Sequence, residues 1–495
     1  MGIDTLRVGD THSGLLIDGQ DGTPYIGAAL RFDQRQGVVV EIPFLHGQRE
    51  AQFTEVDAWF SQQSPPKNLI LAVPGGQILL ADLRWRATSV RSGVSLGTIA
   101  PGETLLGKRD VPVETPLTMT EVRSDIDGLR RWTRFSSIET VPHTDEHGRV
   151  QRLTIEVQSG EGAEWQQGDA TMKFVSEWGT EYPDDDARAG VSVLDTPVLL
   201  SSFPTSRPFA DHLEEQRKVV NLLTLVAGTG IFFRRHRVGD PHIGGFAAGG
   251  GGSLRVHRAE LVSTQTYRDY AQPMPSKPDL DSLLVRLSDV GAEGMARWGA
   301  EWERWKRFIL PAVGVLGRRG AFAEDIITSL SMSFEAAGKI IGVRDGERDT
   351  YGRGRPATAT YVYRCLSVLG VSWGLVASDH VGLAKAIAKT YNSIKHYDGS
   401  DFPDSAVSFV ISHISEYIAR LLALHIIDDT GRLLAPFQEP GAMWRVDRYV
   451  EVYGITFDDG GVVVHQAQLP GTEAEELLGT EAEEMDASDS GAVDT

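Results

Sequence analysis

The segment KTYNSIKHYDG, residues 389–399, gathers side chains that can bind a phosphate and move a proton. A helical repeat of about 100° per residue places four polar side chains of this region on one face: Lys385, Lys389, Asn392 and His396. Histidine titrates near neutral pH and is the usual general acid or base, while lysine supplies positive charge. The alternative is a solvated helix face on which the histidine does no chemistry, and periodicity alone favours that alternative.

Spacing along this helix limits what one chain can do alone. Lys389 and His396 lie two turns apart, roughly 10.5 Å along the axis by the helical rise. A single phosphodiester would not comfortably touch both side chains. Two such helices packed across a two-fold axis could bring the groups together.

A second charged pair precedes this segment. In SFEAAGKII, Glu335 and Lys339 are four residues apart on a predicted helix. They form either a stabilising pair worth a few tenths of a kcal/mol or a second set of charged groups facing the same cleft. The sequence leaves both interpretations open.

An arginine-rich connector follows that helix. VRDGERDTYGRGRPATATY contains four arginines that could grip phosphates, and Tyr351 could stack on a base. The competing interpretation, which the mixed charges favour, is a mobile solvated connector with three partly neutralising acids, Asp345, Glu347 and Asp349. The predicted RNA-binding residues are Lys385, Lys395, Arg344, Arg348, Arg353 and Arg355.

Hydrophobic periodicity predicts an α+β multidomain chain, with a β-rich N-terminal part that is sandwich or barrel-like and an all-α C-terminal bundle. Apolar runs around Pro74-Gly75-Gly76 predict a hairpin. The expected regions are a β-rich domain at 1–205, a helical and loop linker at 206–320 with a glycine-rich loop at 244–252, a helical bundle at 321–430, a C-terminal extension at 431–470, and a disordered acidic tail at 471–495.

Charge and composition exclude several classes. The net charge of −20 argues against a generic nucleic-acid coat, although the tail alone carries nine acidic residues and no Lys or Arg. The single cysteine, Cys365, fits a reducing cytosol, and no His/Cys cluster has metal-site spacing. We expect a cytoplasmic protein without a signal peptide, membrane association, metal or cofactor.

The order of the helical pieces resembles the HEPN superfamily of helical bundles. The order begins with a helix that carries Glu335 and a basic residue four positions later. Two further helices, the segment YNSIKH and a long apolar helix follow it. More narrowly, roughly residues 10–430 resemble the ApeA family of bacterial anti-phage proteins, which pair a β-rich N-terminal domain with an ApeA-like HEPN domain. The other segments that carry this resemblance are GTPYIGAALRF, NLILAVPGGQILLADL, GVSLGTIAPGETLLG, DIDGLRRWTRF and FADHLEEQRKVVNLLTLVAGTG.

This resemblance implies an abortive-infection effector that cleaves RNA without metal, through attack of the neighbouring 2′-hydroxyl. His396 would act as base or acid and Asn392 would orient. The resemblance also implies that the phosphate is contacted by Lys389 and Tyr391. It implies that the cleft is completed by Glu335 and Lys339. The implied partners are cellular or phage RNA, tRNA among them, a phage-derived trigger at the N-terminal domain, and a second copy through the bundle.

The sequence departs from the HEPN R-x4-6-H motif at one position. Tyr391 stands five residues before His396, where arginine is typical, and the nearest upstream base that keeps an x6 spacing is Lys389. Lysine supplies charge but not the bidentate fork of arginine. A second hypothesis is therefore a non-catalytic HEPN module for dimerisation and RNA or nucleotide binding, with a β-rich sensor domain. A third is a ligand-binding β domain with the bundle as scaffold.

Overall fold

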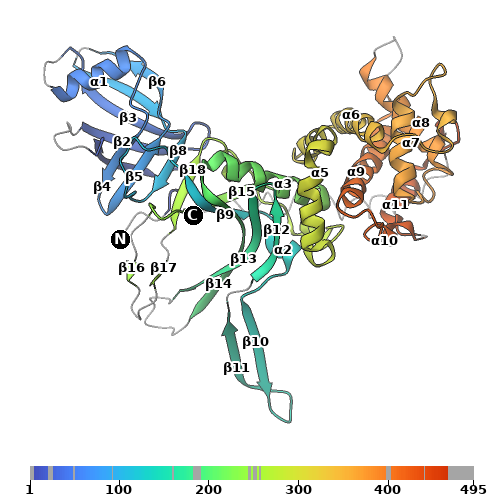
Figure 1. The fold of residues 1–495 in the computed structure, drawn as a ribbon. Coiled ribbons are helices and arrows are strands. Elements are labelled where there is room, and N and C mark those ends of the chain that lie inside the picture. The colour runs from blue at the N-terminus through green and yellow to red at the C-terminus, as the bar shows by residue number, and fades with distance from the viewer. Residues whose placement is uncertain are drawn as a thin grey trace. The chain divides into compact units, whose positions relative to one another are not determined.

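The computed structural model describes residues 5–19, 26–47, 51–91, 93–158, 161–181, 191–243, 247–248, 254–255, 258–396, 403–439 and 441–465. They form two compact units, Met1–Val220 with Ile231–Lys277, and Asn221–Gly230 with Pro278–Thr495 (Figure 1). The first is β-rich and the second helical, which confirms the predicted α+β class. The predicted acidic tail and most of the predicted glycine-rich loop lie outside the described residues.

Within the described residues, the first unit contains one 14-stranded antiparallel sheet. Its strands, in spatial order, are β12 (Glu161–Gln167), β13 (Ala170–Glu181), β14 (Ser192–Arg207), β9 (Met119–Ile126), β15 (Phe233–Gly239), β18 (Ala259–Ser263), β8 (Glu103–Leu106), β5 (Gly76–Ala81), β4 (Leu69–Val73), β1 (Thr11–Ile17), β2 (Ile26–Asp33), β3 (Gly37–Leu45), β7 (Val94–Ala100) and β6 (Arg84–Ser89). The unit also contains the ribbons β10 (Ile138–Thr144) with β11 (Val150–Val157) and β16 (Ala247–Ala248) with β17 (Leu254–Arg255), and the helices α1 (Ala51–Ser61) and α2 (Leu129–Thr133).

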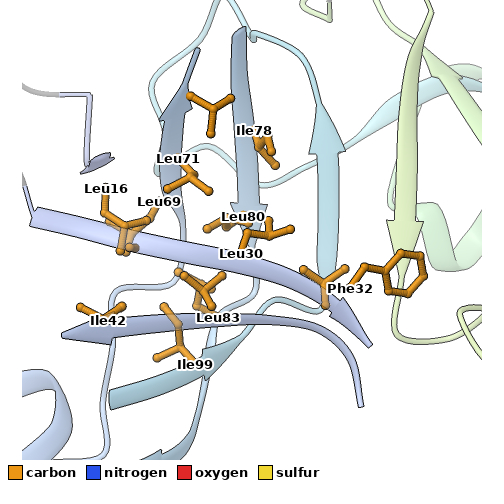
Figure 2. Close-up of a cluster of buried hydrophobic side chains, with 14 of the residues drawn as sticks. Leu16, Leu30, Phe32, Ile42, Leu69, Leu71, Ile78, Leu80, Leu83 and Ile99 are labelled. Carbon is orange, nitrogen blue, oxygen red and sulfur yellow. The ribbon is translucent and has the colours of Figure 1, made fainter. Parts of the chain in front are cut away.

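The sheet curls around a core of aliphatic side chains. Strands β5 and β7 are five positions apart, which would be roughly 24 Å in a flat sheet. Leu80 of β5 and Ile99 of β7 nevertheless belong to one buried cluster, so the sheet must bend back over itself. Figure 2 shows β2, with Leu30 and Phe32, crossing the strand that carries Ile78. This curl agrees with the predicted sandwich or barrel-like domain.

The predicted hairpin at Pro74-Gly75 joins β4 to β5. Val73 pairs with Gly76, so two residues make the turn. Gly75 adopts a φ of +92°, a conformation that glycine reaches without a steric penalty. Turn chemistry at this position therefore sets the register of both strands.

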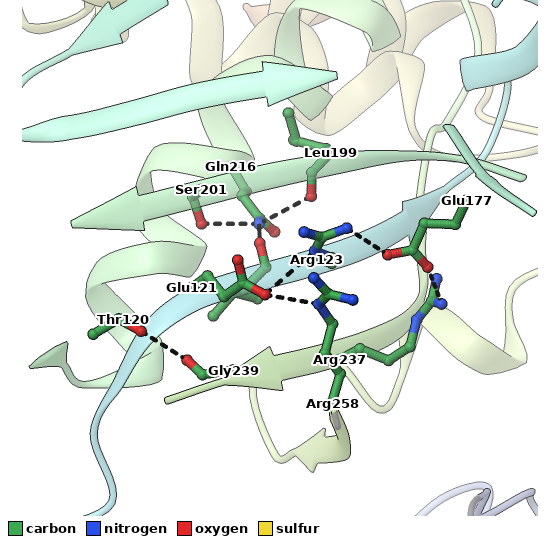
Figure 3. Close-up of polar contacts among 11 residues, drawn as sticks. Thr120, Glu121, Arg123, Glu177, Leu199, Ser201, Gln216, Arg237, Gly239 and Arg258 are labelled. Carbon is green, nitrogen blue, oxygen red and sulfur yellow. Dashed lines mark hydrogen bonds and ion pairs between the residues drawn. The ribbon is translucent and has the colours of Figure 1, made fainter. Parts of the chain in front are cut away.

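Helix α3 (Phe209–Ala227) places a polar network against one face of β9 and β14. Gln216 Nε2 donates to Val122 O at 3.0 Å and to Ser201 Oγ at 3.0 Å. The opposite face of β9 carries ion pairs instead, with Arg123 bonded to Glu177 and Arg258 to Glu121 (Figure 3). Because adjacent strand residues point to opposite faces, β9 separates the buried amides from the charges.

The second unit is built on five long helices in its described part: α5 (Leu287–Leu316), α6 (Ala323–Ile341), α7 (Thr358–Leu369), α8 (His380–Lys395) and α9 (Ser405–Ile427). Its shorter elements are α4 (Lys277–Asp281), which begins at the last residue of the first unit, the 3-10 helix η2 (Glu347–Thr350), α10 (Ala435–Gln438), α11 (Trp444–Tyr453), β19 (Ile455–Phe457) and β20 (Val463–His465). Helix α6 contacts α5, α7, α8 and α9. Its Gly338 allows α7 to approach, since a Cβ there would lie 2.6 Å from the Tyr361 Cα.

Helix α9 is the core helix of this unit. By length and composition alone it could cross a membrane, but 78% of its apolar window is buried inside the structure. Ile414 and Ile418 are fully buried, and Arg420 Nη2 donates to Val226 O and Ser282 O. Such burial is the pattern of a helix that packs against other helices of its own chain.

The expected linker at 206–320 is not a separate region of the structure. Strands β15 and β18 complete the sheet of the first unit, whereas α5 packs in the second. The sequence pattern gave only a weak indication of a strand at β15, because its sequence, FRRHRVG, is dominated by charged residues. Ion pairs such as Arg234 with Asp127 and Arg237 with Asp125 allow so polar a strand to lie inside a sheet.

Candidate functional site at the C-terminal end of helix α8

Helix α8 carries the predicted catalytic segment. Its N-cap is Asp379, whose Oδ1 accepts a hydrogen bond from Gly382 N at 2.7 Å, a contact that fixes the first turn. It ends at Lys395, and His396 leaves the helix with φ −117° and ψ 104°. The shared helical face predicted from the sequence therefore includes Lys385, Lys389 and Asn392 but not His396. Both Asn392 and His396 are exposed.

Four side chains from three helices converge beside this end of α8. The Lys395 ammonium lies 5.2 Å from the centre of the buried Tyr391 ring. A hydrogen bond with the Tyr391 hydroxyl is the largest cause of a raised Lys395 pKa, and the charge of Glu335 on α6 adds to it. Glu335 Oε1 accepts a hydrogen bond from Thr358 Oγ1, at the start of α7, at 2.6 Å. The structure thus brings together Glu335, Tyr391 and Lys395 of the predicted site and adds Thr358.

Lys339 does not pair with Glu335. Its ammonium lies 5.3 Å from the centre of the Tyr361 ring on α7, and no ion pair joins it to Glu335, although both residues are described. The interpretation of these residues as an i,i+4 pair is therefore wrong. The two side chains contact different residues of α7, Glu335 at Thr358 and Lys339 at Tyr361.

The arginine-rich connector is ordered by a buried ion pair. Arg364 of α7 and Glu347 of η2 form two hydrogen bonds, of 2.7 and 2.9 Å, with Glu347 only 2% exposed. Tyr351 also donates to Glu347 Oε1 at 2.8 Å. The Arg364 guanidinium is the main cause that lowers the pKa of Glu347 to about 2. Glu347 is thus not the solvated, neutralising acid expected from the mixed charges of the connector. The signal for its buried partner was Arg364, an arginine inside the apolar stripe of α7.

A tight turn presents two arginines from this ordered connector. Gly352 and Arg355 exchange both backbone hydrogen bonds, of 2.9 and 3.0 Å, and Arg353 and Gly354 have positive φ. Arg348, Arg353 and Arg355 are exposed, and among the described residues their guanidinium groups form no ion pair. The connector leads directly into Thr358, so this turn lies next in the chain to the Glu335 contact.

Lys385 and Lys389 are engaged by the chain's own backbone. Lys389 Nζ donates to Gly460 O at 2.8 Å, and Lys385 Nζ donates to Asp459 O at 3.2 Å. Both carbonyls belong to the turn between β19 and β20. Gly461 of that turn packs so closely on α8 that a Cβ would lie 2.5 Å from Ala386 N. These two lysines therefore anchor a hairpin, whereas Lys395 lies among the converging side chains.

The first unit is identified by comparison with protein families. Residues 18–244 match the family model for ApeA N-terminal domain 1. The chain carries an ApeA N-terminal domain. This match confirms the ApeA resemblance for residues 18–244, and the domain suggests a protein family of anti-phage defence. No curated protein and no solved structure gives a significant match. The matched residues end before α5, so the HEPN assignment of the second unit depends on its own residues.

Proposed function

We propose that this protein is an anti-phage effector of the abortive-infection type whose helical unit is a HEPN ribonuclease. The observation that carries the proposal is the convergence of Glu335, Tyr391 and Lys395 beside the exposed His396, in a chain that also carries an ApeA N-terminal domain. An exposed histidine beside an oriented cation suits a large substrate such as RNA, which docks from outside. The ApeA N-terminal domain then senses a phage-derived trigger or restrains the helical unit.

The reaction is attack of a ribose 2′-hydroxyl on the adjacent phosphorus. The His396 imidazole removes the 2′-hydroxyl proton as the new O–P bond forms, and the bond to the 5′-oxygen breaks after protonation of that oxygen. The products are a 2′,3′-cyclic phosphate and a 5′-hydroxyl. Lys395, held by Tyr391, stabilises the negative charge that develops on the phosphoryl oxygens. Asn392, exposed one turn before His396, orients the substrate.

A second copy of the chain supplies the remaining groups. Each chain offers one such histidine at one helix end, whereas this reaction needs both a base and an acid. A homodimer that apposes two α8 ends provides two histidines and two Lys395 ammonium groups. Lys389 and Lys385 keep free N–H donors beyond their carbonyl contacts, because an ammonium group has three.

Cleavage of total bacterial RNA in EDTA tests the nuclease. The purified full-length protein, with and without lysate of phage-infected cells, should produce fragments that end in 2′,3′-cyclic phosphate. The lysate arm is included because a restrained enzyme needs its trigger. Intact RNA in both arms, or fragments that end in 3′-hydroxyl, would refute the proposed reaction.

RNA binding should depend on the exposed turn at 352–355. Replacing both Arg353 and Arg355 by alanine removes two phosphate contacts, so the slope of log affinity against log salt should become less steep by about 1.4 for single-stranded RNA. Fluorescence anisotropy at several salt concentrations measures this slope. The matched control replaces the exposed Lys306 and Arg307 of α5 by alanine. An equal change in the control would mean that only net charge matters.

The burial of Tyr391 favours the non-catalytic alternative as a second candidate. Its side chain is 2% exposed and occupies the position where HEPN nucleases carry arginine. A Tyr391→Arg variant separates the two candidates, because it restores the arginine of the HEPN motif. The nuclease predicts unchanged or higher cleavage by a folded variant. Tight RNA binding without cleavage in wild type and variant alike would support the binding module.

A further inference from the structure

A polar cavity lies in the second unit, and none of its lining residues belongs to the α8 site. It has a volume of about 170 Å³ and is formed by α5, the C-terminal end of α6, and the C-terminal end of α9. Its polar lining consists of Arg297, Glu301, Arg304, Arg344 and His425. Of these, only Arg344 was predicted from the sequence to bind a ligand, as a member of the RNA-binding connector.

The cavity carries more positive than negative charge. Arg297 is satisfied by the protein, since its Nε donates to Ile426 O at 3.0 Å and its Nη1 pairs with Asp429 at 2.5 Å. Glu301 accepts a hydrogen bond from Trp305 Nε1 at 3.0 Å and lies 3.4 Å from Arg304. Two of the three guanidinium groups, those of Arg297 and Arg304, thus have a carboxylate partner.

The third guanidinium group of the cavity belongs to Arg344. Its Nε is buried and has no hydrogen-bond partner, and no ion pair joins its side chain to any described residue. A buried donor without a partner is costly, and native proteins usually satisfy such groups. The backbone N–H of Arg344 bonds to Glu347 Oε2 at 2.9 Å, so the buried ion pair of the connector holds Arg344 at the cavity.

The surroundings of His425 also favour binding of an anion in the cavity. The ring lies edge-on to Trp305, with the centroids 6.3 Å apart. Burial lowers the pKa of His425, and the charges of Arg344 and Arg297 lower it further, so the ring is neutral at pH 7 and adds a hydrogen-bonding nitrogen. An anion in the cavity would face guanidinium N–H groups from Arg344 and Arg304 together with this ring.

We propose that this cavity binds a phosphate group. Guanidinium forks match phosphate oxygens with paired hydrogen bonds, and the volume is smaller than the roughly 300 Å³ at which pockets for drug-sized ligands begin. The side chain of Arg304 is 60% exposed, which leaves a route of entry for a phosphate attached to a larger molecule. The phosphate belongs either to a free nucleotide or to the 5′ end of an RNA. This site is independent of the proposed nuclease reaction.

Calorimetric titration of the full-length protein tests the site. Inorganic phosphate and AMP are the free ligands, and two oligoribonucleotides that differ only in a 5′-phosphate or a 5′-hydroxyl test the RNA end. Arg344→Gln and Arg304→Gln should each weaken phosphate binding at least tenfold. Arg307→Gln, an exposed arginine on α5 that does not line the cavity, should leave it unchanged.

The outcomes separate the sources of the phosphate. Tighter binding of AMP than of inorganic phosphate would assign the cavity to a nucleotide, and a preference for the 5′-phosphorylated oligonucleotide would assign it to an RNA end. An absence of phosphate binding at physiological salt, or equal affinities in wild type and both cavity variants, would overturn the proposal. Because binding is measured without cleavage, failure of the nuclease hypothesis would not affect this result.

Discussion

His396→Ala should reduce RNA cleavage by about 10²–10⁴-fold, the range typical for loss of a general acid or base. The same variant should no longer arrest growth of infected cells. Lys395, Tyr391 and Glu335 remain in place, so RNA affinity should change little. Cleavage of total RNA in EDTA and an RNA-binding titration on the same preparation measure the two effects separately.

The variant should stay folded, because His396 is exposed and follows the last residue of α8. Its backbone N–H, which donates to Asn392 O at 2.9 Å, is retained by alanine. The matched control is His465→Ala, which removes another exposed histidine of the second unit. Full anti-phage activity of His396→Ala would rule out the proposed nuclease, and an equal loss in His465→Ala would rule out a specific role for His396.

Arg364→Met should lower the free energy of unfolding of the second unit by about 3–5 kcal/mol, because it leaves the Glu347 carboxylate buried without its charge partner. Methionine retains most of the side-chain length, so the lost charge rather than a cavity dominates. Urea denaturation of the full chain, followed by a probe in the second unit, measures this loss. Lys306→Met is the control, because it breaks the exposed pair with Glu303 and should cost less than about 1 kcal/mol.

Acid should reduce this difference between wild type and Arg364→Met. The pKa of Glu347 in the folded protein is about 2, below its ordinary value of 4.5. The ion pair therefore stabilises the fold fully above pH 4.5 and loses its contribution as the pH falls toward 2. Denaturation at pH 7 and at pH 3 compares the two proteins. A difference that stays constant or grows at pH 3 would contradict the proposed role of Glu347.

The helical bundle was predictable where apolar residues recur at one helical period along the sequence. Leu330, Phe334 and Ala337 recur at helical spacing and are buried, and the apolar face of α8 follows the same rule. Helix ends are less predictable, because the last turn depends on local capping, and His396 falls one residue beyond α8. The candidate helix was therefore predictable from the sequence, but the polar helical face expected to include His396 ends before that residue.

Contacts between distant residues were the part that local patterns could not predict. Glu347 resembles the solvated acids beside it, and only the fold places Arg364 against it. The carbonyls that engage Lys385 and Lys389 belong to a turn more than 70 residues away. Similarly, β15 is too charged to resemble a strand, and it becomes one because its neighbours in the sheet supply the opposite charges.

The pairing of β8 with β18 has a consequence for biosynthesis. Leu105 of β8 lies opposite Leu261 of β18, so β8 pairs with a strand that is synthesised more than 150 residues later. Until Ser263 has left the ribosome, β8 and β15 keep open edges at which nascent chains could associate wrongly. The candidate nuclease segment at the end of α8 is translated well after that point. All strands of the β-rich first unit are therefore synthesised before the segment that carries His396.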